Sequence, residues 1–139
     1  IMRLDVYLTF DGQCEEAMTF YQSVLGGKIE TMMKVAGSPA ESQYPPEAKD
    51  YVLHAHLQLQ NLNIMASDAP PALYSKPAGM QIVIEPDETG EAERIYAALS
   101  EGGAIEHEMT ATFFAKRYAM FADRFGVRWM IVCGAPEQN

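Results

Sequence analysis

Hydrophobic and polar residues alternate in two short segments of the chain, residues 4–10 and residues 80–85. Alternation with a period of two is typical of a strand with one buried face, because successive side chains point to opposite sides of a sheet. Each segment is therefore predicted to be a strand with one core face and one more polar face. The more polar faces carry the following side chains: Asp5, Tyr7, Gln81 and Val83.

A helical pattern follows each predicted strand. Apolar residues recur at i, i+3, i+4, i+7 and i+8 from Ala17 to Leu25, and a shorter stripe runs from Ala92 to Leu99. Apolar residues at this spacing form one face of an amphipathic helix. Each stripe stops near a glycine pair, and glycine ends helices because it adopts the left-handed cap conformation without a Cβ penalty. The two pairs are Gly26-Gly27 and Gly102-Gly103.

The two helical segments belong to an internal repeat. The stretch EEAMTFYQSVLGGKIE, residues 15–30, is echoed by GEAERIYAALSEGGAIE, residues 90–106, at an offset of about 75 residues. The glycine pair and the Ile-Glu that follows one residue later coincide in the two copies. This repeat is too long for one unit of a solenoid. It predicts two copies of one supersecondary module in a single chain.

A β-hairpin is predicted to close the first module. It covers residues 54–67 and turns at Gln60-Asn61, so that the numbers of facing residues sum to 121. The leucines then gather on one face, whereas His54, His56 and Met65 share the other. Clean sorting supports this register, because a slip of one residue would exchange the two faces.

The second hairpin is predicted over residues 118–133, with a turn at Phe125-Gly126. Adding 65 to the numbers of the first hairpin gives its equivalent positions. Trp129 then lies on the apolar face, where we interpret it as a core anchor rather than a ring stacked on a ligand. Phe121 and Met130 fall on the opposite face. Asp123 and Arg128 are expected to form an exposed pair beside the turn.

The predicted order is strand, helix and three strands, given twice. This order defines an α+β fold of tandem βαβββ modules. The strand after each helix is expected at residues 30–35 and 104–108. We predict one domain over residues 1–139, divided into a first module, a linker rich in turn formers and a second module. The approximate bounds of these parts are 1–68, 69–78 and 79–135.

Three stretches of the chain resemble the glyoxalase-like, or vicinal oxygen chelate, superfamily, and within it the PhnB-like branch. They are YLTFDGQCEEAMTFYQSVLGG (residues 7–27), HAHLQLQNLNIMASDA (54–69) and TFFAKRYAMFADRFGVRWMI (112–131). The resemblance implies curved mixed sheets that enclose a pocket, with the helices outside. It also implies a homodimer and, in many members, a divalent metal in the pocket. These motifs specify a fold more strongly than a chemistry.

The positions that hold the metal in such members carry weak donors in this chain. The resemblance places ligands on the first strand and on the last hairpin strand of each module. The last-strand positions are Met65 and Met130, and the first-strand candidates are Asp5 and Gln81. A thioether is a poor ligand for hard or borderline divalent ions. We therefore expect no metal and no other cofactor.

The pocket that the resemblance implies should bind a small molecule. Methionines suit such a site because their side chains are flexible and polarizable, although they are also common in cores. Lys116 and Arg117 are expected near the mouth of the pocket, where they either steer an anionic ligand or form a solvated charge pair. The predicted lining residues are Asp5, Tyr7, His56, Met65, Gln81, Val83, Phe121 and Met130.

His54 and His56 are the candidates for a catalytic role. They lie one residue apart on the same predicted face, which separates their Cα atoms by about 7 Å. Either histidine suits a general base near neutral pH, and either also suits a polar wall of the pocket. A rearranged metal site would use Asp5, His56 and Gln81. His107 is expected to be exposed to solvent.

The charge and composition narrow the class of protein. The net charge is −9, which argues against nucleic-acid binding and against binding to anionic membranes. No apolar run reaches the roughly 20 residues of a membrane-spanning helix. Cys14 and Cys133 lie far apart with no CxxC motif, as expected of a reduced cytoplasmic protein.

The sequence leaves two functions open. The first is a glyoxalase-like protein that binds a small molecule without a metal, either as an enzyme or as a binding protein. The alternative is a metal-dependent lyase, transferase or dioxygenase of the same superfamily. Proteins that resemble this chain are also described as demethylubiquinone methyltransferases, but no glycine-rich nucleotide loop follows a strand here.

Overall fold

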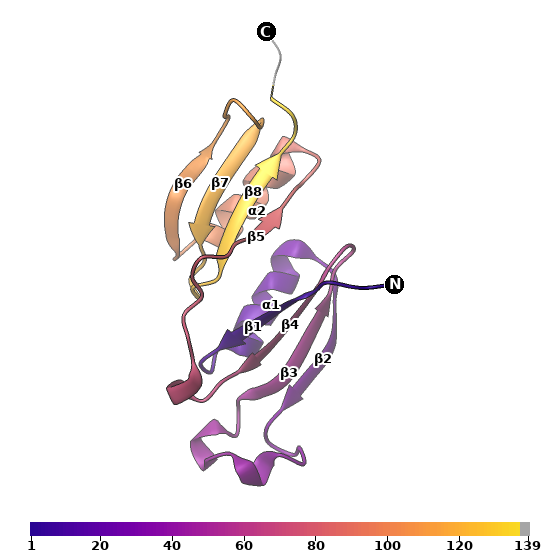
Figure 1. The fold of residues 1–139 in the computed structure, drawn as a ribbon, viewed down its shortest axis with the longest axis vertical. Helices are drawn as coiled ribbons and strands as arrows, with labels where there is room; N and C mark the ends of the chain where they lie inside the picture. Colours follow the sequence, from indigo (N-terminus) through magenta and orange to yellow (C-terminus); the bar gives the residue numbers. More distant parts are fainter. Residues whose placement is uncertain (137–139) are drawn as a thin grey trace. The chain divides into compact units, whose positions relative to one another are not determined.

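A computed structural model describes residues 1–136 of the chain, in two compact units, Ile1–Ser75 and Lys76–Asn139 (Figure 1). Each unit contains one helix and four strands in the order βαβββ, and the predicted α+β fold of tandem modules is confirmed. The first unit consists of β1 (Val6–Phe10), α1 (Cys14–Leu25), β2 (Lys28–Lys34), β3 (Val52–Gln58) and β4 (Asn63–Asp68). The second unit consists of β5 (Ile82–Ile84), α2 (Thr89–Ser100), β6 (Ala104–Thr110), β7 (Arg117–Ala122) and β8 (Arg128–Cys133).

Both units form the same mixed four-stranded sheet. The strand order is β1-β4-β3-β2 in the first sheet and β5-β8-β7-β6 in the second. The first and last strands of each module pair in parallel, and the other neighbours pair antiparallel. Short 3-10 helices lie in the connections at Glu41–Gln43, Pro46–Ala48 and Pro71–Leu73. No helix among residues 1–136 combines the length and the apolar character needed to cross a membrane.

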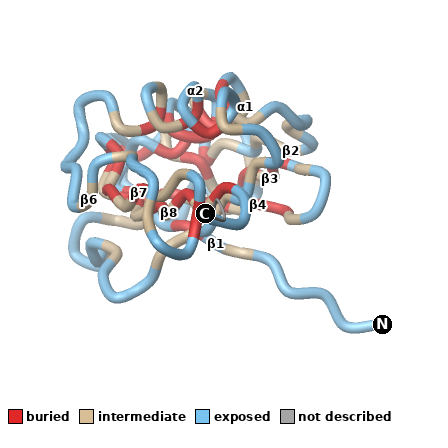
Figure 2. The backbone as a smooth tube through the Cα atoms, turned by 90° about the horizontal axis from the view of Figure 1, so that it is seen from above, coloured by how far each residue is buried: buried red, intermediate tan, exposed pale blue. Residues whose placement is uncertain are grey.

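In each unit the helix covers one face of the sheet and builds the core there. Buried residues alternate with more exposed ones along the strands (Figure 2). In the first unit the helix-covered face includes Phe10, Leu57 and Ile64, which are almost completely buried. The opposite face of each sheet, which we call the open face, carries the side chains that alternate with these core residues.

The predicted register of the first hairpin is confirmed. His56 faces Met65 and Leu57 faces Ile64 across β3 and β4. The pairing continues to the turn, where the Leu59 N–H donates to the Leu62 carbonyl at 3.0 Å. His56 and Met65 therefore lie on the open face, as the alternation of leucines and polar residues predicted.

The predicted register of the second hairpin is wrong by one residue on β7. Met120 faces Met130, and Phe121 faces Trp129. Phe121 is fully buried, and its ring meets Tyr96 of α2 edge-on with 5.7 Å between centroids. Phe121 is therefore a core residue under the helix and not part of the open face. Met120 takes the open-face position that the sequence assigned to Phe121.

The carboxylate of Asp123 explains this shift. Five residues, 123–127, connect β7 to β8, one more than the 59–62 connection of the first hairpin. Asp123 Oδ1 accepts the N–H groups of Phe125 and Val127 at 2.9 and 3.0 Å. Asp123 Oδ2 accepts the indole N–H of Trp129 at 2.9 Å. The carboxylate thus replaces missing backbone partners and stabilises the longer turn.

The predicted surface pair of Asp123 and Arg128 is therefore wrong. Asp123 is buried, and the Arg128 guanidinium instead donates to the Glu106 carboxylate at 2.9 Å. This hydrogen bond lowers the pKa of the Glu106 carboxyl group. Trp129 is fully buried, which confirms its predicted place in the core.

In the first unit a buried carboxylate organises the start of α1. Asp68, at the end of β4, accepts the N–H groups of Gly12, Cys14 and Val52 at 2.8 to 3.0 Å. A negative charge is favourable at a helix N-terminus. Burial, followed by the nearby charge of Asp68, raises the pKa of the Cys14 thiol to about 12. That thiol stays neutral near pH 7 and is not a candidate nucleophile.

Candidate functional site

The four strands of the first sheet align a row of side chains across its open face. Tyr7 on β1 is in register with Met65 on β4, Met65 with His56 on β3, and His56 with Thr31 on β2. Because these are facing positions on adjacent strands, the four side chains form one continuous line. The row brings together three of the predicted site residues: Tyr7, His56 and Met65. Thr31 was not predicted.

A second row runs across the open face of the second sheet. Val83 on β5 is in register with Met130, Met130 with Met120, and Met120 with His107 on β6. Met65 and Met130, at the positions where the family resemblance places metal ligands (the metal-equivalent positions), thus occupy equivalent places in the two rows. His107, expected in solvent, is half-buried and closes this row beside the ring of Tyr118, with 4.8 Å between ring centroids.

His54 lies on the same open face and contacts Tyr7. The Tyr7 hydroxyl and His54 Nδ1 are hydrogen-bonded at 3.3 Å. Their rings stack with 5.8 Å between centroids and an angle of 28° between planes. About half of the Tyr7 surface is exposed, so this polar, aromatic pair is accessible to a ligand.

His56 is held by an amide that the sequence analysis did not single out. His56 Nε2 lies 2.8 Å from Asn63 Oδ1, and the Asn63 amide Nδ2 donates to Asp5 Oδ1 at 3.2 Å. The same Asp5 oxygen accepts the Asn63 backbone N–H at 3.2 Å. Asp5 therefore orients Asn63 so that its carbonyl oxygen faces His56. In the neutral ring, this arrangement places the proton on His56 Nε2 and leaves Nδ1 as the acceptor.

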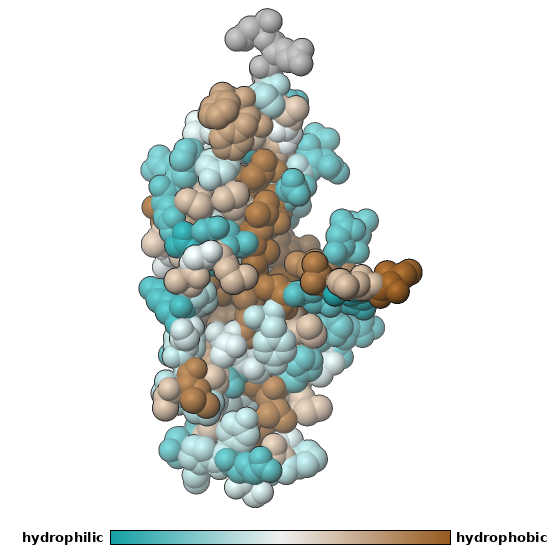
Figure 3. All heavy atoms as spheres, viewed as in Figure 1, coloured by the Kyte–Doolittle hydropathy of each residue, from teal (hydrophilic) through white to brown (hydrophobic). Residues whose placement is uncertain are grey.

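The open face of the second sheet is more apolar. A brown, hydrophobic band lies over the region of β8 in the space-filling view (Figure 3). In the strand register, Met130 on β8 faces Val83 on β5. Arg128 is the first residue of β8, and its guanidinium donates to the Glu106 carboxylate. The Nε atom of Arg128 is buried and has no hydrogen-bond partner among residues 1–136. A buried donor of this kind is normally satisfied by a protein group or by an ordered water. Gln81, just before β5, is half-buried.

The donor groups of the first sheet fit a divalent metal poorly. No group of three or more His, Cys, Asp or Glu residues in the described part of the chain is arranged to hold a metal ion. Asp5 is engaged by Asn63 and by Arg3, whose guanidinium lies 3.2 Å from its second oxygen. His56 directs Nε2 at Asn63, and the neighbouring Met65 offers only a thioether. We therefore assign no chemistry to a metal at this face.

The two modules define the class of fold, an α+β fold of tandem βαβββ modules. A glyoxylase/bleomycin resistance protein/dioxygenase domain from Frankia sp. EAN1pec shares the fold, with a TM-score of 0.62 over 96% of this chain and 98% of that chain. It is 14% identical in sequence, so this likeness concerns the fold alone.

The family follows from closer similarities. A family model described as 3-demethylubiquinone-9 3-methyltransferase matches residues 3–132. Protein YjdN of Escherichia coli K12 is 33% identical over 141 residues, covering 94% of this chain and 94% of YjdN. Protein PA1353 of Pseudomonas aeruginosa is 39% identical, with a TM-score of 0.88 over 96% of this chain and 98% of that chain.

A PhnB protein from Bacillus cereus has the same fold with a TM-score of 0.81, at 22% identity over 96% of this chain and 100% of that chain. The chain belongs to the 3-demethylubiquinone-9 3-methyltransferase-like (PhnB) family, and it shares its fold with glyoxalase-like proteins. The resemblance noted in the sequence is thereby confirmed.

Proposed function

We propose that this protein binds a small organic molecule against an open sheet face, and that it does so without a divalent metal. The observation that carries the proposal is the pair of rows, Tyr7–Met65–His56–Thr31 and Val83–Met130–Met120–His107, in which methionine stands at both metal-equivalent positions. Ligand sites combine apolar surface with a few well-placed polar groups, and each row contains side chains of both kinds.

The polar groups of the first row indicate how a ligand would be oriented. His56 Nδ1 is the acceptor of a histidine whose other nitrogen is already fixed by Asn63. A ligand hydroxyl or an acidic proton is the matching donor, and His56 is the candidate general base if a reaction follows. Tyr7 and His54 add an aromatic wall with a hydroxyl group. The methionines adapt to the apolar part of the ligand.

Methyl transfer, which the family description names, does not enter this proposal. The sequence has no glycine-rich loop after a strand that would hold a nucleotide-containing methyl donor. The side chains of the two rows also include none that would specifically recognise a nucleotide-containing methyl donor. The proposal is therefore one of binding, with His56 as the residue on which a catalytic activity would depend.

A thermal-shift screen of small metabolites tests the proposal, because a ligand that binds the folded state raises its melting temperature. For the strongest ligand, the affinities of His56→Ala and Met65→Ala should be compared with that of Thr19→Ala, which changes an exposed position of α1. We expect both open-face variants to weaken binding about tenfold, equal to about 1.4 kcal/mol, and Thr19→Ala to leave it unchanged. Equal affinities in all three variants would contradict the proposal.

A further inference from the structure

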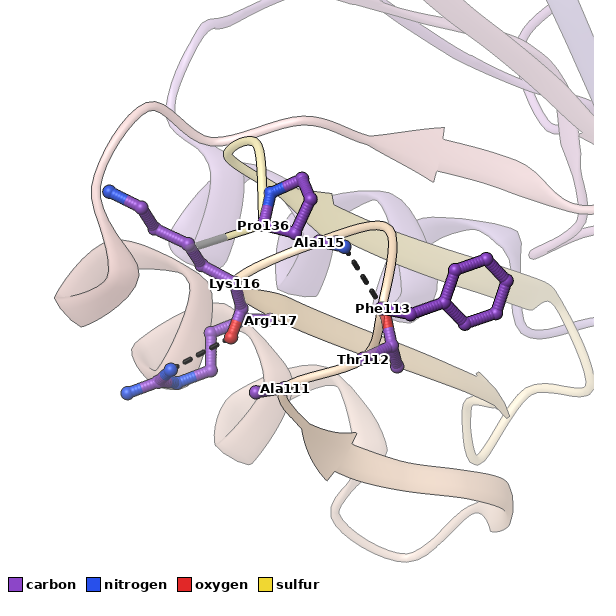
Figure 4. A pocket seen from close by; sticks show the side chains of 7 residues that line it. All are labelled: Ala111, Thr112, Phe113, Ala115, Lys116, Arg117 and Pro136. Atoms are coloured by element: carbon purple, nitrogen blue, oxygen red, sulfur yellow. Dashed lines mark hydrogen bonds between the residues drawn. The ribbon is translucent and has the colours of Figure 1, made fainter. Parts of the chain in front are cut away.

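A cavity of about 510 Å³ lies at the connection between β6 and β7 (Figure 4). Its volume is within the range of small-molecule sites, about 300 to 1,000 Å³. It belongs entirely to the second unit, and none of its lining residues is a member of the two rows described above. The residues that matter here are Thr112, Phe113, Ala115, Lys116, Arg117 and Pro136.

The loop that forms the cavity is a tight, hydrogen-bonded turn. Thr112 donates its N–H to the Ala115 carbonyl at 3.0 Å, and its hydroxyl oxygen accepts the N–H groups of Phe114 and Ala115 at 3.3 and 3.1 Å. Ala115 is fully buried and anchors the turn. The turn therefore presents Phe113 at a defined position, with 90% of its surface exposed.

The two cations beside this turn differ in how their charges are balanced. The guanidinium of Arg117 donates to the Glu93 carboxylate at 3.0 Å and to the Lys116 carbonyl at 2.8 Å. No carboxylate of the described residues lies within ion-pair distance of the Lys116 ammonium group. The Lys116 stem runs against Gly134, where an added Cβ would lie 3.1 Å from Lys116 Cδ. Lys116 is thus an exposed cation that is paired with no carboxylate of residues 1–136.

We propose that this cavity binds an organic carboxylate with a flat apolar body. Figure 4 shows the side chains of Lys116 and Arg117 extending to one side of the loop, and the Phe113 ring lying on the other. The carboxylate of the ligand pairs with the Lys116 ammonium group. Its apolar body covers Pro136 and reaches the Phe113 ring, whose exposure to water is otherwise unfavourable. An anionic ligand is favoured over a neutral one because only the anion pairs with the Lys116 ammonium group.

The probe that tests this proposal is 2-naphthoate, a fused aromatic ring with one carboxylate. Its binding to the full chain is followed by amide chemical shifts, which report where it binds. We expect shifts at residues 112–117, and weaker binding as salt is raised, because salt screens the ion pair. No binding at millimolar probe, or shifts confined to the residues of the two rows, would overturn the proposal. The latter result would instead support the site in the proposed function.

Substitution of the cation provides the second test. Lys116→Gln removes the charge and keeps a polar side chain that is one atom shorter, and we expect it to weaken 2-naphthoate binding about fivefold. The matched control is Lys49→Gln, which removes a lysine that lines a separate groove in the first unit. Phe113→Ala, at an exposed position that does not support the core, should also weaken binding. Unchanged affinity in Lys116→Gln would overturn the proposal.

Discussion

Replacing Gly103 by alanine should lower the free energy of unfolding by roughly 3 kcal/mol or more. A Cβ at Gly103 would lie 2.0 Å from the carbonyl oxygen of Ala122 and 2.9 Å from the carbonyl carbon of Asp123. Both atoms belong to the backbone of the second hairpin, so no side chain can move aside to make room. The strand β6 would have to separate from β7, and their shared hydrogen bonds would be lost.

A second glycine of the same unit is the control for this prediction. Gly90 lies in α2, and an added Cβ there meets no atom within 4 Å. Gly90→Ala should therefore leave stability unchanged or raise it by about 0.5 to 1 kcal/mol, because alanine has the higher helix propensity. Urea denaturation followed by circular dichroism measures both variants. Equal stabilities for Gly103→Ala and the wild type would show that the glycine pair acts only as a helix stop.

Replacing Asp123 by alanine is expected to cost about 3 kcal/mol, because three buried N–H groups lose their acceptor. Two of them belong to the backbone of the turn, and the third is the indole N–H of Trp129. Trp129 is the only tryptophan of the chain, so its fluorescence reports the loss of this unit directly. We expect an earlier fluorescence transition in urea and a changed emission of the folded state.

The control for Asp123→Ala is Asp87→Ala, which removes an exposed acidic residue of the same unit. We expect it to change stability by less than about 0.5 kcal/mol. If Asp123→Ala behaves like Asp87→Ala, the turn does not depend on the carboxylate, and our explanation of the shifted register fails.

Regular patterns in the sequence were sufficient for the fold. The repeat of residues 15–30 at 90–106 predicted two modules, and the alternation of residues 54–67 predicted the first register. The second register failed because the predicted hairpin was copied from the first, and the extra turn residue depends on Asp123. The Asp123 side chain thus places Phe121 in the core and Met120 on the open face, the reverse of the predicted arrangement.

The candidate site was predicted only in part, for a related reason. The alternation of polar residues gave Tyr7, His56 and Met65, because they follow from the strand period alone. The place of His107 depends on pairing between β6 and β7, which contains register shifts that no period in the sequence encodes. Asn63 lay on the predicted polar face, but its link between His56 and Asp5 depends on a contact between distant segments.

The glycine pairs have two roles, and the sequence predicted only one of them. The sequence suggested that they end the helices, and Gly26 and Gly102 have positive φ angles of 82° and 76° in keeping with that role. The second member of each pair has another function. A Cβ at Gly27 would lie 2.4 Å from the Gln58 carbonyl oxygen, much as one at Gly103 would meet Ala122. Only the folded sheet reveals this close approach.

The metal content of the protein tests the central claim most directly. Protein purified without a chelator should be analysed for divalent ions together with His56→Ala. With Met65 and Met130 at the metal-equivalent positions, we predict far less than one ion per chain in both proteins. One divalent ion per wild-type chain, lost in His56→Ala, would contradict the account and support a rearranged metal site on the open face.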